Sequence, residues 1–158
     1  MSSLMGDCRV VMPANETDVK RKQARIYLSK SALGSGGKQP PESDEEGLIP
    51  HWAIVVEFYN HGFWVEMGGV QNGGKLKGCY IKSTEKPTGT FYKFRDSSVL
   101  LPIFPAGFPD IHEIQISPND LYRIARNHPY NNKAYNILNM RCYEWASEAA
   151  NIIAEQLK

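Results

Sequence analysis

YNILNMRCYEWASEAANIIAEQLK spans residues 135–158 and carries the strongest helical pattern in this chain. Small and apolar residues recur along it at the spacing of one helix face: Cys142, Ala146, Ala149 and Ile153. The pattern predicts a C-terminal helix that begins near Asn139, a good N-cap residue, and packs this face on a sheet. With Asn139 as the cap, Cys142 is the third residue of the helix.

Cys142 is the residue of this helix that carries chemistry. A thiol in the first turn lies near the positive end of the helix dipole and near backbone N–H groups that have no partner within the helix. Both favour the thiolate, which is the reactive form of cysteine. His51, at the head of the apolar segment HWAIVVEF (51–58), is a candidate base for this thiol. A cysteine in such a place is more often a small buried residue, and such a histidine is more often structural, so both alternatives stay open.

Length and composition indicate one globular domain. The chain has 158 residues, of which 42% are hydrophobic and 22% charged, and its net charge of +1 gives no reason to expect nucleic-acid binding. No apolar run approaches the ~18 residues of a membrane span, so we expect no integral membrane segment. The three cysteines form no CxxC pair, which predicts neither a structural metal nor a disulfide framework. We expect no cofactor and a reducing setting in the cytoplasm or the nucleus.

The chain divides into an arm, a domain and a long loop. Residues 1–22 are polar and end in a basic cluster, which predicts a flexible N-terminal arm. Residues 23–158 form the single domain. Within it, residues 31–47 are rich in glycine, proline and acidic side chains, which predicts a mobile surface loop.

The remaining patterns predict an α+β fold, with a small antiparallel sheet packed against the C-terminal helix. Alternating or apolar segments predict strands at 24–29, 51–57, 63–67, 78–82, 90–94 and 112–116. Residues 59–62 and the glycine pairs at 68–69 and 73–74 predict turns. Ser117 and Pro118 predict the start of another helix, which Pro129 ends. His128, directly before Pro129, is expected to cap the end of that helix, where a cation suits the dipole.

Three segments together resemble a known family of proteins. HWAIVVEF (51–58), FWVEMGGVQ (63–71) and AYNILNMRCYEWASEAANII (134–153) are similar to the PPPDE family of permuted papain-fold cysteine peptidases, which includes the desumoylating isopeptidases. More distant similarity extends to the lecithin:retinol acyltransferase and NlpC-type proteins. The resemblance implies a circularly permuted papain-like fold, with Cys142 as nucleophile and His51 as base.

The resemblance also assigns roles to residues around this pair. Family members commonly have two asparagines directly before the cysteine, whereas this chain has only Asn139, which implies an auxiliary contact there. Glu66 stands where the acyltransferase relatives have a second histidine, which implies a carboxylate that orients His51. A narrow substrate groove is implied with these candidate residues: Trp52, Trp64, Gly68, Gly69 and Arg141.

Three functions follow as alternatives. The first is an isopeptidase or peptidase that cleaves an amide in a protein substrate, such as a conjugate of a ubiquitin-like modifier. The second is a thiol acyltransferase, or a lipid or peptide amidase, of the same fold. The third is a binding module on a fold that has lost catalysis. The sequence predicts no particular oligomeric state.

Overall fold

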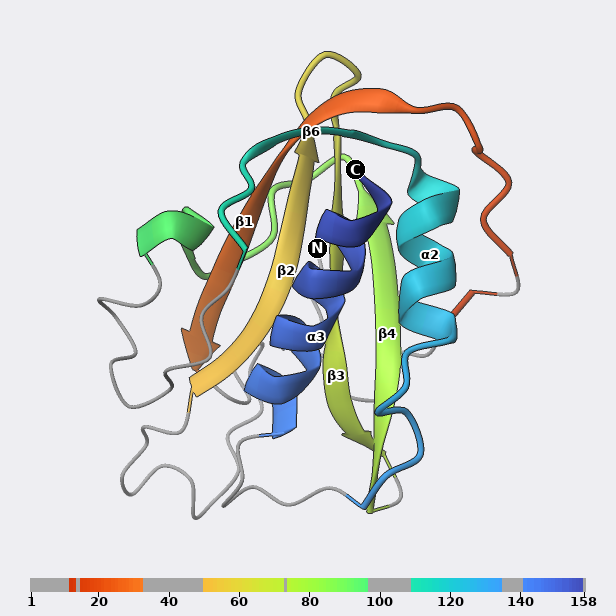
Figure 1. Cartoon of the computed structure of the whole chain (residues 1–158), viewed down its shortest axis with the longest axis vertical. Coiled ribbons are helices and arrows are strands. Elements are labelled where there is room, and N and C mark those ends of the chain that lie inside the picture. Colours follow the sequence, from red (N-terminus) through yellow and green to blue (C-terminus); the bar gives the residue numbers. More distant parts are fainter. Residues whose placement is uncertain are drawn as a thin grey trace.

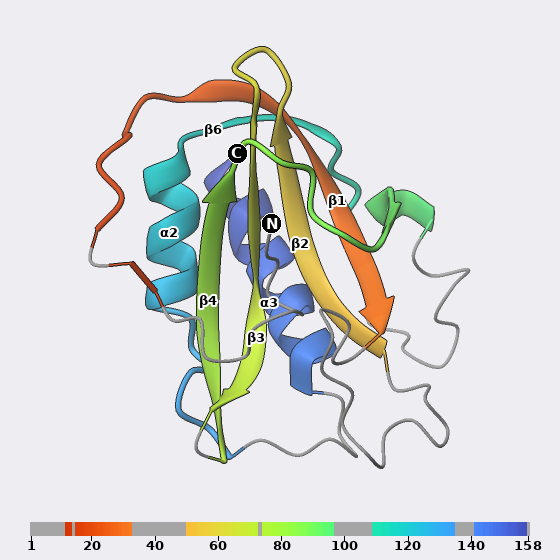
Figure 2. The same ribbon diagram turned by 180° about the vertical axis from the view of Figure 1, so that it is seen from behind.

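A computed structural model describes residues 12–13, 15–32, 50–72, 74–96, 109–134 and 141–157. In these residues, six strands form one antiparallel sheet in the order β4-β3-β2-β1-β5, with β6 also paired to β1. Helices α2 and α3 lie side by side on one face of it, as Figures 1 and 2 show from opposite sides. We call this side the helix face. The predicted α+β class, with a small antiparallel sheet and a C-terminal helix, is confirmed.

The predicted hairpin is the centre of the sheet. β2 (Pro50–Phe58) pairs with β3 (Phe63–Asn72), with Ile54 opposite Met67 and Phe58 opposite Phe63. The turn lies where the sequence predicts it, and Gly62 adopts a φ of 75°, which favours glycine. Alternate residues of β2 then face the two sides of the sheet.

One expected turn is wrong. Gly68 and Gly69 lie inside β3 and pair with Cys79 and Gly78 of β4 (Lys75–Ser83), so the strand continues past the predicted end at Met67. Packing requires a glycine at position 69, because an added Cβ would come within 2.7 Å of the Trp145 side chain. The chain turns instead after Asn72, where Gly74 has a φ of 79°.

The outer strands differ in length from the predicted ones. β1 (Lys22–Ala32) extends the predicted strand at both ends, so the first two residues of the expected loop at 31–47 belong to the sheet. Residues 33–47 lie outside the described part of the chain. β5 (Thr90–Tyr92) is shorter than expected, and a 3-10 helix, η2 (Phe94–Asp96), follows it. β6 (Glu113–Ile116) begins one residue later than predicted.

Helix α2 (Pro118–Arg126) begins as the sequence predicts. The Asp120 backbone N–H donates to Ser117 Oγ at 3.0 Å, and the Ser117 backbone N–H donates to Asp120 Oδ2 at 3.3 Å. This reciprocal capping box satisfies backbone donors that a helix start otherwise leaves unpaired. Leu121, Ile124 and Ala125 of this helix are buried, and the helix packs on β3 and β4.

Helix α3 (Arg141–Gln156) buries the predicted face. Cys142 is 4% exposed, and Ala146, Ala149 and Ile153 are fully buried against β2 and β3. Trp145, which widens this face, is also fully buried. Asn139, the expected cap, lies outside the described residues.

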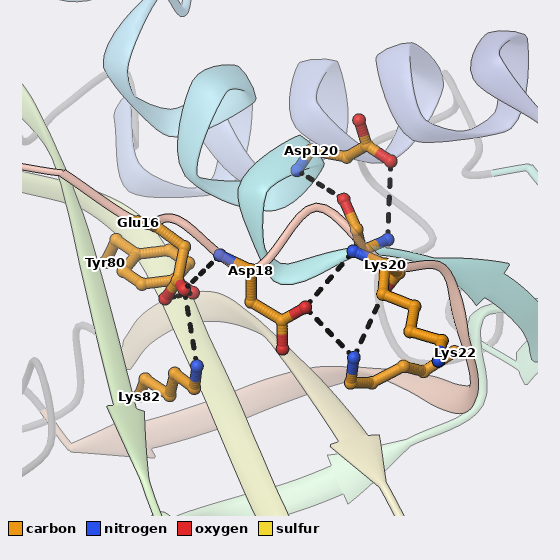
Figure 3. A network of polar contacts seen from close by, with 8 residues as sticks. Glu16, Asp18, Lys20, Lys22, Tyr80, Lys82 and Asp120 are labelled. Carbon is orange, nitrogen blue, oxygen red and sulfur yellow. Dashed lines mark hydrogen bonds and ion pairs between the residues drawn. The ribbon is translucent and has the colours of Figure 1, made fainter.

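Part of the expected arm is attached to the domain. The Glu16 carboxylate accepts from Tyr80 Oη at 2.7 Å and from Lys82 Nζ at 3.3 Å, while its backbone carbonyl accepts from Asn119 Nδ2 at 2.6 Å. Asp18 accepts from Lys22 Nζ at 3.0 Å (Figure 3). These contacts fasten residues 16–22 to both α2 and β4, so this stretch does not behave as the free arm that composition predicts.

The two faces of the sheet carry separate apolar clusters. The larger cluster lies on the helix face and takes from β2 the side chains of Trp52, Ile54, Val56 and Phe58. A small cluster on the opposite face joins Ala53, Val70 and Cys79. Burial on both faces explains why β2 reads as a continuous apolar run rather than an alternating one.

Candidate active site

The environment of the Cys142 thiol is dry and rich in backbone donors. Burial raises the pKa of this thiol to about 11, and backbone hydrogen bonds from Trp52, Tyr143 and Cys142 itself act in the opposite direction. The first turn of α3 therefore does supply N–H groups to the sulfur, as the sequence predicts. Loss of water outweighs their effect, so the group rests as a neutral thiol at neutral pH.

His51 is also buried, and it directly precedes Trp52 in β2. It is 3% exposed, and burial lowers its pKa to about 4. Its Nε2 atom has no hydrogen-bond partner among the described residues. The ring is therefore neutral at neutral pH, and this nitrogen is not committed to a structural bond.

Both candidate residues adjoin Trp52: Cys142 contacts its backbone, and His51 precedes it in the sequence. The sulfur contacts the N–H of Trp52, and His51 is the residue directly before it in β2. Alternation along the strand turns the Trp52 side chain toward α3 and starts the His51 side chain toward the opposite face. The hydrogen bonds that shift the thiol pKa come from backbone groups and not from an imidazole.

Trp52 packs over the first turn of α3. Its ring meets the Tyr143 ring edge to face, with centroids 6.3 Å apart and planes at 79°. Lys30 Nζ lies 5.7 Å from the centre of the Trp52 ring, because Lys30 is opposite Trp52 in the β1–β2 ladder. The side chain is 1% exposed, and its Nε1 has no partner among the described residues. Sequence reasoning missed Lys30 and Tyr143, since strand register brings Lys30 here and the docking of α3 brings Tyr143.

Glu66 does not lie beside His51. It is 2% exposed and sits opposite Val55, four residues along β2 from His51. That offset corresponds to about 13 Å along a strand. The orienting role that the resemblance implies for Glu66 is therefore not supported by the register.

The expected groove residues divide between the two faces of the sheet. Gly69 faces the helices, and Trp145 fills the space above it. Trp64 faces the other way, where its ring lies 5.8 Å from that of Phe91. Gly68 alternates with Gly69 and shares the face of Trp64. Only Trp52 of this set lies next to Cys142; the side chain of Arg141 and all of Asn139 lie outside what the structure describes.

A second histidine–tryptophan pair joins the two helices. His128 Nε2–H donates to the Trp145 carbonyl at 2.9 Å, and His128 Nδ1 accepts from the Tyr130 backbone N–H at 3.0 Å. The two rings stack at 4.1 Å, and Trp145 Nε1–H donates to Asn131 Oδ1 at 3.0 Å. Burial lowers the pKa of His128 to about 4. The expected cap role of His128 is wrong, because Asn127 is the C-cap of α2. His128 is neutral and uses both ring nitrogens inside the fold.

Neither a metal-binding cluster nor a membrane-spanning helix occurs among the described residues. Within them, no group of three or more His, Cys, Asp or Glu side chains is placed to hold a metal ion. No described helix has the length and apolar character that crossing a bilayer requires. No protein-family profile, curated protein sequence or solved structure matches the chain. The resemblance to permuted cysteine peptidases accordingly stays a prediction that rests on the motif residues.

Proposed function

We propose that this protein is a cysteine-dependent isopeptidase or peptidase of the permuted papain-like type, with Cys142 as nucleophile and His51 as base. Its proposed substrate is an amide in a protein, such as a conjugate of a ubiquitin-like modifier. One observation carries the proposal: the Cys142 thiol, in the first turn of α3, contacts the backbone N–H of Trp52, the neighbour of His51. A nucleophile and a base from distant parts of the chain thus flank one residue.

The proposed chemistry starts from two neutral groups. The raised thiol pKa and the lowered imidazole pKa favour proton transfer during attack over a resting ion pair. Because the His51 side chain starts toward the opposite face of the sheet, its ring has to reach the sulfur around the end of β2. A ring nitrogen of His51 then takes the thiol proton as Sγ bonds to the amide carbon. The imidazolium then protonates the leaving amine as the C–N bond breaks, which leaves a thioester on Cys142. Water, deprotonated by His51, attacks the thioester and releases a carboxylate and the free thiol.

Backbone donors support the same reading. In the proposed mechanism, the N–H groups that contact the sulfur also hold the oxyanion of a tetrahedral intermediate, which needs preorganised donors in a dry site. Removing one such donor in a characterised hydrolase typically costs about 10²–10³ in kcat. Hydrolysis by this route needs no metal or cofactor.

The test is covalent labelling by a modifier-derived probe that ends in an electrophile. We expect the wild-type protein and Cys79→Ala to be labelled and Cys142→Ala to be inert, each scored by intact mass. Cys79 is the matched control, because it is equally buried but lies on the opposite face of the sheet. A wild-type protein that takes no label, or a label that persists in Cys142→Ala, would exclude the isopeptidase. A lipid acyl group found on Cys142 instead would redirect the assignment to acyl transfer.

One observation favours the binding module as a second candidate. Burial holds both Cys142 and His51 uncharged, whereas an activated cysteine has a lowered pKa. On this alternative, the modifier or its C-terminal peptide binds without any covalent adduct. Binding by calorimetry, with equal affinity in wild type and Cys142→Ala and with no probe labelling, would assign the chain to this class.

A further inference from the structure

The indole of Trp52 is a buried donor without an acceptor. An indole N–H can only donate, and in folded proteins nearly all buried donors have a partner. Trp52 is 1% exposed, yet its Nε1 has no hydrogen-bond partner among the described residues. An unsatisfied buried N–H costs about 1–3 kcal/mol, so its retention at this place calls for a role.

The same molecule contains the satisfied counterpart. Trp145 is also fully buried, and its Nε1–H donates to Asn131 Oδ1 at 3.0 Å. Both indoles lie on the helix face and both contact α3 or form part of it. The fold therefore provides an acceptor for one buried indole and leaves open the other, whose ring packs on Tyr143 and whose backbone N–H contacts Cys142.

The surroundings of the Trp52 ring favour negative charge. Lys30 Nζ lies 5.7 Å from the ring centre and the side chain of Lys30 is exposed. The first turn of α3 adds the positive end of the helix dipole. Glu144 is the acidic residue of this turn. It follows Cys142 by two residues, which places it about 200° around the helix axis from the thiol.

We propose that Trp52 Nε1–H, the ammonium group of Lys30 and the first turn of α3 form a binding subsite for a carboxylate. A carboxylate oxygen accepts from the indole N–H, and the charge is balanced by Lys30 and the helix dipole. The inference deepens the proposed function and in that sense rests on it, because amide cleavage at Cys142 releases a carboxylate at this place. The subsite would hold the acid product after the thioester is hydrolysed.

Sodium acetate is the probe, read by the indole Hε1 signals in a ¹H–¹⁵N NMR spectrum. The chain has three tryptophans and so three such signals, which Trp52→Phe and Trp64→Phe assign. We expect the Trp52 signal to move downfield and saturate with acetate, since a new hydrogen bond deshields the proton. The Trp145 signal should stay in place. Acetamide and sodium chloride at equal concentrations should move neither signal.

Paired lysine variants test the charge. Lys30→Gln should weaken acetate binding about 2- to 5-fold, the range expected for one partly solvated charge contact. Lys86→Gln is the matched control, because Lys86 Nζ likewise lies over an aromatic ring, that of Phe91, at 5.2 Å. The Phe91 ring carries no N–H, so loss of the Lys86 charge should leave acetate binding unchanged.

The outcomes separate this subsite from the catalytic proposal. Acetate binding that persists in Cys142→Ala, together with absent probe labelling in wild type, keeps the subsite and removes the isopeptidase. A Trp52 signal that ignores acetate, or that moves equally with acetamide, overturns the subsite whether or not Cys142 is labelled. Equal loss of binding in Lys30→Gln and Lys86→Gln would also overturn it, because the effect would then come from overall charge.

Discussion

Two buried histidine–tryptophan pairs occur in this fold, and they are built differently. In the pair His128 and Trp145, both imidazole nitrogens and the indole N–H are hydrogen-bonded. In the pair His51 and Trp52, His51 Nε2 and Trp52 Nε1 have no partner among the described residues. The pKa of each histidine is lowered to about 4 by burial, so neither burial nor charge state distinguishes the pairs.

The difference indicates which pair serves the fold and which is available for chemistry. The first pair ties the segment after α2 to α3, and both imidazole nitrogens and the indole N–H are used in doing so. The second pair flanks the start of α3, where a nucleophile is proposed. Buried polar groups without partners are exceptions in folded proteins, and a role in binding a ligand is the explanation proposed for these two.

The largest effect is expected at Trp145. Trp145→Ala should lower the free energy of unfolding by about 3–5 kcal/mol, because it empties the space over Gly69 and leaves the Asn131 side chain without its donor. Urea denaturation measures the loss. Trp64→Ala, at a half-buried position on the opposite face, should cost clearly less. Equal losses would contradict the assignment of Trp145 as the packing centre of the helix face.

Acid should destabilise the fold through both histidines. Each has a pKa of about 4 when folded and an ordinary value of 6.5, so the unfolded chain binds more protons between these limits. Stability is then fully present above about pH 6.5 and falls as the pH drops toward 4, by about 3 kcal/mol for each ring. Urea denaturation at pH 7, 5.5 and 4.5 measures this. His51→Phe and His128→Phe should each flatten the decline, and a decline unchanged in both would show that neither ring is buried neutral.

A smaller effect should separate the two rings at constant pH. At pH 7.5, His128→Phe should cost about 1–3 kcal/mol, since it leaves the Trp145 carbonyl and the Tyr130 N–H without their partners. His51→Phe removes no described hydrogen bond from Nε2 and should cost less. Chemical denaturation of the two variants side by side gives the comparison directly. If His51→Phe proved the more damaging change, His51 would be a structural residue and the proposed base would have to be sought elsewhere.

Local patterns predicted most elements of this fold. The spacing from Cys142 to Ile153 predicted the buried face of α3, and Ser117 with Pro118 predicted the start of α2. These signals are short in range, because helix periodicity and caps depend on residues within about one turn of one another. The glycine pair at 68–69 misled for the same reason. A local rule treats two glycines as a turn, whereas Gly69 makes room for the side chain of Trp145, which is 76 positions away in the sequence.

The sequence by itself determined that a sulfur stands in the first turn of a helix and that an imidazole heads an apolar strand. Only the tertiary structure decided what surrounds them: the Trp52 N–H on the sulfur, Lys30 over the indole, and Glu66 opposite Val55 rather than beside His51. The reason is that strand register and helix docking are set by contacts between residues far apart in the chain. No local spacing records which buried nitrogen finds a partner and which is left without one.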